Sequence, residues 1–300
     1  MSASTAVRES MGDRVFLVAI YVFLSVIMII VAYPLIYVFS SSFSSASAVI
    51  AGKVWLWPVQ PTLDGYMGVF RYPEVWTGYL NSIIYTVCGS ILSVVLTIMM
   101  AYPLSKKDFY GRKFFTWALL FSMMFSGGLI PFYLLVKSLG LLNTRLSMII
   151  PGALSVFSVI VAKSFFQSTI PEDLYEAAEL DGCSDINFLV RIVLPLSKPI
   201  IAVLVLWSVV GQWNSYFNAL IFLNSQSLYP LQLVLREILI LNNVSMSSMN
   251  LSPEQLKLFQ DMKTLLQYSL IVVASVPVLL MYPLAQKYFV KGVMIGSVKE

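Results

Sequence analysis

Histidine is absent from this 300-residue sequence, and cysteine is nearly so. Histidine is the most common metal ligand and the usual general base, so its absence argues against a zinc enzyme or an acid–base enzyme of the familiar kind. The two cysteines, Cys88 and Cys183, form no CxxC pair and no metal-like spacing. Neither a disulfide framework nor a bound metal ion is therefore expected.

Charge is scarce as well. Charged residues make up 11% of the chain, whereas soluble domains carry about a quarter. Hydrophobic residues make up 58%, and the mean hydropathy is +0.82. The net charge of +4 is too small and too scattered to predict a nucleic-acid partner. This composition predicts a protein whose surroundings are membrane lipid.

Six apolar runs are each about as long as a bilayer-spanning helix needs to be. None carries Lys, Arg, Asp or Glu in its interior, and we therefore predict an all-α integral membrane protein with six transmembrane helices, near Val15–Phe39, Gly78–Leu104, Phe114–Val136, Leu146–Ala162, Pro199–Leu223 and Leu266–Tyr288. The first run is longer than the core of a signal peptide, which favours an uncleaved anchor.

The distribution of basic residues predicts the orientation of these helices. If the N-terminus is cytoplasmic, twelve of the 19 Lys and Arg residues fall in cytoplasmic segments and seven fall outside. The positive-inside rule then places both termini in the cytoplasm. We expect a cytoplasmic tail at 1–14, a permease domain at 15–290 with outer loops at 40–77 and 224–265, and a second cytoplasmic tail at 291–300.

The interiors of the predicted spans contain no ionisable residue of the kind that carriers and pumps use to bind ions. Their polar residues are neutral and gather in the fifth run, as Gln212, Asn214, Tyr216 and Asn218. On one helix Asn214 and Asn218 would share a face. These residues either link helices by hydrogen bonds or line a translocation path for a hydroxyl-rich solute. In the third run, Gly127 and Gly128 precede Pro131 and predict a kink or a close helix crossing.

The segment 169–198 is unusual because it gathers six of the chain's 15 acids against Arg191 and Lys198. Thr169 and Glu172 have the spacing of a capping box, and we predict a helix that ends at Asp181 and Gly182. Along it, Glu172, Glu176 and Glu179 would form one edge, while a stripe containing two alanines would allow close approach. A second helix with Ser184 as its N-cap should run to Pro195. We interpret the segment as a rigid plug for a groove on a cytoplasmic partner.

The same segment resembles the EAA loop of ABC importer permeases. Glu176-Ala177-Ala178 is followed after three residues by Gly182, after nine more by Ile192, and after one more by Leu194-Pro195. Further stretches, among them "WNSYFNALIFL", "YPLQLVL" and "QKYFVKGVMIGSVKE", are similar to carbohydrate-importer permeases of the maltose-type second-subunit class, in the oligosaccharide subgroup. The resemblance implies the ABC type I importer transmembrane architecture in a bacterial plasma (inner) membrane.

The resemblance also implies partners: a second permease subunit, an ATPase dimer, an extracytoplasmic solute-binding protein and a sugar or oligosaccharide substrate. This chain would not be an enzyme and would bind no cofactor, because it has no phosphate-binding GxxxxGK[ST] motif; ATP and Mg²⁺ would bind the partner ATPase. By this resemblance the ATPase-coupling residues would be Glu176, Ala177, Ala178, Asp181, Gly182, Ile192, Leu194 and Pro195, with Gly292 and Gly296 as a C-terminal ATPase contact. Residues 224–250 would reach toward the binding protein.

Three other hypotheses about function remain consistent with the sequence. An ABC importer permease for an amino acid or a peptide would share the coupling loop. A carrier or channel that works without ATP would keep transporting solute after loss of any ATPase. A polytopic membrane enzyme would show activity from this chain alone, although the absence of histidine disfavours it.

Overall fold

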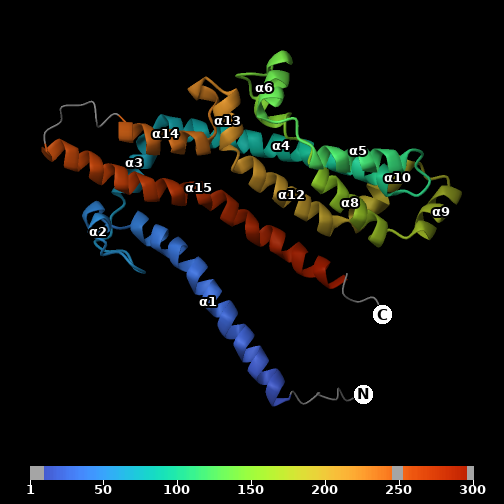
Figure 1. Cartoon of the computed structure of the whole chain (residues 1–300), viewed down its shortest axis with the longest axis horizontal. Helices are drawn as coiled ribbons and strands as arrows, with labels where there is room; N and C mark the ends of the chain where they lie inside the picture. Colours follow the sequence, from blue (N-terminus) through green and yellow to red (C-terminus); the bar gives the residue numbers. More distant parts are fainter. Residues whose placement is uncertain (1–9, 245–252, 296–300) are drawn as a thin grey trace. The chain divides into compact units, whose positions relative to one another are not determined.

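The computed structural model describes residues 10–244 and 253–295, and in these residues every regular element is a helix. This confirms the all-α prediction. The chain divides into two compact units, one formed by Met1–Arg71 with Val244–Val273 and the other by Tyr72–Asn243 with Ala274–Glu300. Figure 1 labels the helices of both units along the chain.

The first unit contains α1 (Met11–Ser42), α2 (Ala46–Ile50), α3 (Asp64–Arg71) and the first part of α15 (Pro253–Ile295). A capping box starts α1, where the Ser10 side chain accepts from the Asp13 N–H and the Asp13 carboxylate accepts from the Ser10 N–H. Nearly all apolar side chains of α1 are exposed, as expected of a helix that faces lipid.

Of the predicted outer loop 40–77, residues 40–71 are folded in this unit. A small core of Ala48, Val49 and Val54 packs against the Tyr268 ring of α15. At Gly65 a Cβ atom would lie 2.3 Å from the Ser269 hydroxyl oxygen, so α3 approaches α15 too closely for any larger residue.

The second unit is built around α4 (Pro73–Ser105), which packs against α8 (Val156–Thr169) and α12 (Lys198–Trp213). Small residues and one phenylalanine fill the contact, including Ala101, Val159, Ala162, Phe166 and Leu204, all of which are buried. These three helices form the frame on which the candidate sites lie.

A sharp bend separates α5 (Arg112–Met124) from α6 (Leu129–Ser138), whose axes differ by 114°. Gly128 has a φ of 85°, which only glycine adopts readily, and the break lies directly ahead of Pro131. The predicted kink is confirmed. A Cβ atom at Gly127 or Gly128 would meet nothing within 4 Å, so the glycines serve the bend and not a close helix crossing.

Three helical segments are long and apolar enough to cross a membrane, namely Met11–Ser42, Pro73–Ser105 and Gln260–Pro283, and up to five spans result if each of two bent helix pairs counts as one. The fourth predicted run is divided between α7 (Leu146–Ile149) and α8, and the fifth between α12 and α13 (Tyr216–Phe222). The number six therefore stays a prediction.

The remaining helices are short. The predicted plug folds as α9 (Glu172–Leu180), α10 (Asp185–Phe188), a π-helical turn η1 (Leu189–Val193) and α11 (Leu194–Leu196). The outer segment contains the 3₁₀ turn η2 (Gln226–Leu228) and α14 (Leu231–Val244). In Figure 1, α9 and α10 lie at one end of the second unit, well away from α13 and α14.

Candidate functional site

The first candidate site is α9, and its start differs from the prediction. Thr169 is the last residue of α8, Pro171 is the N-cap of α9, and no side chain caps the helix. The capping-box prediction was wrong because Ile170 precedes a proline, which disfavours helical backbone there and ends α8. The helix itself covers Glu172–Leu180 as expected.

The end of α9 is closed by Gly182, as predicted. Its φ of 75° lies in the left-handed region. The Gly182 N–H donates to the Glu179 carbonyl and the Cys183 N–H donates to the Ala178 carbonyl, both at 2.9 Å. This pair of bonds is the Schellman motif, which fixes the direction in which the chain leaves a helix.

The second half of the loop is anchored in the core of the second unit. Ser184 caps α10 by accepting from the Asn187 N–H, as predicted. Phe188 and Val193 are buried, Ile192 and Leu194 are half-buried, and Pro195 is exposed. Proline cannot donate a backbone hydrogen bond, and the wider π-helical turn ends two residues ahead of it.

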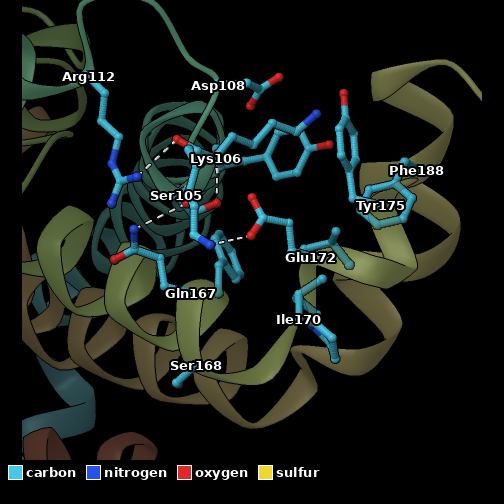
Figure 2. Close-up of a pocket in the computed structure, with 15 residues that line it drawn as sticks. Ser105, Lys106, Asp108, Arg112, Gln167, Ser168, Ile170, Glu172, Tyr175 and Phe188 are labelled. Carbon is cyan, nitrogen blue, oxygen red and sulfur yellow. Dashed lines mark hydrogen bonds and ion pairs between the residues drawn. The ribbon is translucent and has the colours of Figure 1, made fainter. Parts of the chain in front are cut away.

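Two lysines that follow α4, Lys106 and Lys107, bind the segment that contains α9 and α10. Lys106 forms an ion pair with Asp185, and Lys107 forms one with Glu172. The Lys106 ammonium also lies 3.6 Å from the centre of the Tyr175 ring, and the Tyr175 hydroxyl donates to Asp185 at 3.2 Å. Figure 2 shows Lys106, Glu172 and Tyr175 around a pocket of about 480 Å³.

These contacts shift the charges at the base of the loop. The hydrogen bond from Lys106 lowers the pKa of Asp185 below its usual value. Burial alone would lower the pKa of Lys106, but hydrogen bonds with Asp185 and two tyrosines outweigh burial and raise it. Asp185 and Glu172 therefore stabilise the loop internally. No local sequence pattern indicates these two ion pairs, because their partners are far apart in the chain.

The outer face of α9 is left open. Asp173, Glu176, Ala177 and Leu180 are exposed, and Leu180 is 89% accessible. Ala178, which was predicted to present the same close-packing surface as Ala177, is half-buried against the core. Leu180 was missed by the sequence analysis, although its position three residues after Ala177 places it on the same face. Asp181 and Gly182 are also exposed at the tip.

The second candidate site is a cavity of about 370 Å³ between α4, α8 and α12. Hydroxyl and amide side chains and two aromatic rings line it, and none of its lining residues is charged; they include Ser93, Thr97, Ser155, Ser158, Ser208, Gln212, Ser215 and Asn218, with Phe157 and Trp207. The two rings lie 5.4 Å apart, centre to centre.

Gln212 and Asn218 are thus brought together, whereas Asn214 and Tyr216 are not. Asn214 ends α12 and donates to the Val210 carbonyl at 2.9 Å, and α13 starts at Tyr216. The prediction that Asn214 and Asn218 share one helix face was wrong, because the chain leaves the helix between them. Tyr216 is 45% exposed and does not line the cavity.

A glycine allows Gln212 to lie against α4. A Cβ atom at Gly89 would be 2.6 Å from the Nε2 atom of Gln212 and 2.8 Å from its Cδ atom. The amide therefore occupies the space that the missing side chain leaves. This position of Gln212 depends on the absence of a side chain at residue 89.

A third feature is the segment after α13, around residues 227–229, which buried polar side chains of α4 bind through hydrogen bonds. The Asn81 amide donates to the carbonyls of Ser227 and Tyr229 at 2.8 and 3.1 Å, and the Tyr85 hydroxyl donates to the Leu228 carbonyl at 2.8 Å. These bonds satisfy a turn whose backbone would otherwise be unpaired. The first part of the predicted binding-protein loop is therefore held against α4.

The predicted C-terminal contact can be located only in part. Gly292 lies in the last turn of α15, and Gly296 lies outside the described residues. Within the described part of the chain, no group of three Cys, Asp or Glu side chains could hold a metal ion.

The chain was compared with known proteins. Protein LplC of Bacillus subtilis is 39% identical over 299 residues and is covered along its full length, as is this chain. The polygalacturonan/rhamnogalacturonan transport system permease protein YtcP of the same organism is 40% identical, with coverage of 96% of this chain and 100% of the relative. A solved bacterial ABC transporter involved in the import of the acidic polysaccharide alginate contains a chain with 34% identity and a TM-score of 0.83, covering 95% of this chain and 100% of that chain.

Residues 93–295 match the family described as binding-protein-dependent transport system inner membrane component. This range includes α9, the cavity and all of α15. The match covers more than half of the chain, and it agrees with the full-length relatives. The chain therefore belongs to the binding-protein-dependent transport system inner membrane components, as a bacterial inner-membrane permease of the ABC transporter class.

Proposed function

We propose that this chain is one of two permease subunits of an ATP-driven importer for an oligosaccharide, and that α9 couples it to a cytoplasmic ATPase. The observation that carries the proposal is the construction of α9. Its inner side is fixed to the core through Phe188, Lys106 and Lys107, while its outer side presents Glu176, Ala177 and Leu180 without partners among the described residues.

A helix held in this way can transmit a force from a partner that contacts its outer face to the transmembrane helices. The Gly182 motif fixes where the chain turns. The ion pair of Lys107 with Glu172 fixes α9, and that of Lys106 with Asp185 fixes α10, to the residues that follow α4. A force on the outer face would reach α4, α8 and α12 through the packed cluster around Phe188. Leu180 would fill an apolar groove on the ATPase, Ala177 would allow close approach, and the carboxylates would meet basic residues. ATP and Mg²⁺ would bind the ATPase alone.

The cavity supports a carbohydrate substrate. Sugars offer hydroxyl groups to Ser, Thr, Asn and Gln side chains and apolar faces to aromatic rings such as Trp207 and Phe157. The relatives named above include transporters of polygalacturonan, rhamnogalacturonan and alginate. Because the cavity lining carries no charge, we infer that it recognises the hydroxyl groups of the solute, and that any acidic groups are bound by the partner subunit or the binding protein.

The proposal includes six spans with both termini in the cytoplasm. The bent pair of α5 and α6 would form one span, and α7 with α8 another. In this orientation α9 faces the ATPase, and the segment around η2 faces the solute-binding protein. The hydrogen bonds of Asn81 and Tyr85 support that role, because they hold the segment firmly enough to act as a docking platform.

The test combines reconstitution with a change of bulk at Ala177. The complex is purified through a tag on this chain and reconstituted in liposomes with its binding protein. Ala177→Trp should abolish ATPase co-purification and oligosaccharide uptake, because an indole on the exposed face of α9 prevents close approach. Ala177→Ser, which keeps the side chain small, serves as the matched control and should retain both.

Two results would contradict the proposal. Uptake that continues without ATP, or in the presence of vanadate, would indicate a carrier or channel. Normal ATPase co-purification and uptake in Ala177→Trp, with the variant inserted at wild-type levels, would show that α9 does not contact the ATPase.

A further inference from the structure

A pocket lined by basic residues lies where the chain passes from α4 into α5. The turn after Lys106 and the first turns of α5 enclose, with α8, a pocket of about 640 Å³. Four cationic side chains line it against one carboxylate, that of Asp108; the cations are Lys107, Arg112, Lys113 and Lys163. The polar cavity has no residue in this pocket, and the coupling helix meets it through the ion pair of Lys107 with Glu172.

Three of these cations have no counter-charge. Lys107 pairs with Glu172, but Arg112, Lys113 and Lys163 form no ion pair among the described residues. The Lys163 ammonium donates to the Thr116 hydroxyl at 3.1 Å, and the Arg112 guanidinium donates to the Lys106 carbonyl at 3.4 Å. The pocket thus holds like charges near one another, which an anion would stabilise.

The surface beside the pocket indicates what kind of anion. Lys113, Trp117 and Phe121 follow one another at intervals of four residues on α5, so they lie on one face with steps of about 6 Å along the helix. Trp117 is 72% exposed and Phe121 is 62% exposed. No residue of α5 is buried. A cation, an indole and then an apolar ring match the order of headgroup, interface and acyl chain in a lipid leaflet.

We propose that this pocket binds the phosphate of an anionic phospholipid headgroup, with Arg112, Lys113 and Lys163 around the phosphate and the acyl chains along Trp117 and Phe121. A lipid headgroup and free inorganic phosphate both offer a phosphate anion, and either could neutralise these cations. A lipid fits better because the exposed aromatic stripe continues directly from the pocket, and a free phosphate would leave that stripe uncovered. The family's inner-membrane location supplies such a leaflet.

The indole of Trp117 provides a local reporter. The whole complex is placed in nanodiscs of phosphatidylcholine that contain either brominated phosphatidylglycerol or brominated phosphatidylcholine, and quenching of tryptophan fluorescence is measured. Subtracting the signal of Trp117→Phe isolates the contribution of residue 117. We expect phosphatidylglycerol to quench it at least about fivefold more effectively, since each basic residue near an anionic lipid contributes roughly that factor.

The double variant R112Q/K163Q should remove this preference, whereas Lys137→Gln, which removes an exposed cation at the end of α6, should leave it intact. R112Q/K163Q should lose no thermal stability in phosphatidylcholine alone, because the two cations repel each other there; a large loss would indicate a purely structural role and overturn the proposal.

Three further outcomes would overturn it. Equal quenching by both lipids would show that the pocket does not select an anion. Loss of the preference in excess inorganic phosphate would reassign the site to a free anion. No quenching by either lipid would show that another protein surface covers Trp117.

Discussion

The glycine that ends α9 offers the sharpest test of the coupling mechanism. Gly182 has a φ of 75°, and a Cβ atom there would meet nothing within 4 Å. The Cβ atom that Gly182→Val adds therefore meets no other described residue. Its effect on the turn comes from forcing a β-branched residue into the left-handed region or making it leave that region.

The free-energy cost of Gly182→Val follows from these two alternatives. Holding an L-residue in the left-handed region costs about 1–2 kcal/mol. Leaving it breaks the bonds from Gly182 to Glu179 and from Cys183 to Ala178, at about 1 kcal/mol each. In both cases the substitution destabilises the native turn by about 1–2 kcal/mol relative to other conformations of the segment. This lowers the population of the native turn about 5- to 30-fold. We expect oligosaccharide uptake to fall by a similar factor.

Gly140 provides a matched control in the same protein. It ends α6 with a φ of 68°, a Cβ atom there would also meet nothing, and the Leu141 N–H donates to the Val136 carbonyl in the same Schellman arrangement. Gly140→Val should therefore cost similar stability. Because Gly140 lies outside the coupling loop, this variant should keep ATPase co-purification and most of the uptake.

The assay compares both variants in cells that lack the wild-type chain, with uptake of labelled oligosaccharide divided by the amount of tagged chain in the membrane. Co-purified ATPase is measured from the same cells. Equal loss in both variants would attribute the effect to general instability, and normal uptake in Gly182→Val would refute the role of the turn.

Two further predictions concern the base of the loop and the cavity. Lys106→Met should lower the free energy of unfolding by about 1 kcal/mol at pH 7, a modest value because Asp185 is largely exposed. The lowered pKa of Asp185 means that its stabilisation is present at neutral pH and is lost as the pH falls from about 5 through that pKa, so thermal unfolding of the variant should depend less on pH in this range. Gly89→Ala should displace the Gln212 amide and raise the KM for uptake several-fold with normal assembly, whereas Gly152→Ala in the same cavity, where a Cβ atom meets nothing, should leave the KM unchanged.

Local sequence signals predicted the local parts of the site. The end of α9 at Gly182, the Ser184 cap and the bend at Gly127–Gly128 each depend on residues within a few positions of one another, so their chemistry can be read directly. The failures were of a different kind. Thr169 and Glu172 have capping spacing, but the constraint from Pro171 on Ile170 ended α8 first.

Long-range contacts were beyond the reach of sequence patterns. The pairing of Lys106 with Asp185 joins residues that are far apart in the chain, and nothing near either residue indicates the other. The division of the fifth apolar run after Trp213 was also missed. The helical segments on both sides of the break are apolar, so the average hydropathy stays high across it. Asn214, which ends α12, is therefore predicted from the sequence to lie on a helix face.

The helix breaks and the polar cavity have a common explanation. Gly152 and Ser155, from the break between α7 and α8, and Ser215, from the break between α12 and α13, all line the cavity. Backbone groups that leave a helix within a bilayer must find partners, and this is possible only where they face protein or water. An inner-membrane permease can therefore tolerate these breaks beside a polar space but not against lipid. That both breaks meet the same neutral cavity supports placing the solute path between α4, α8 and α12, where a few degrees of motion transmitted from α9 would change its width.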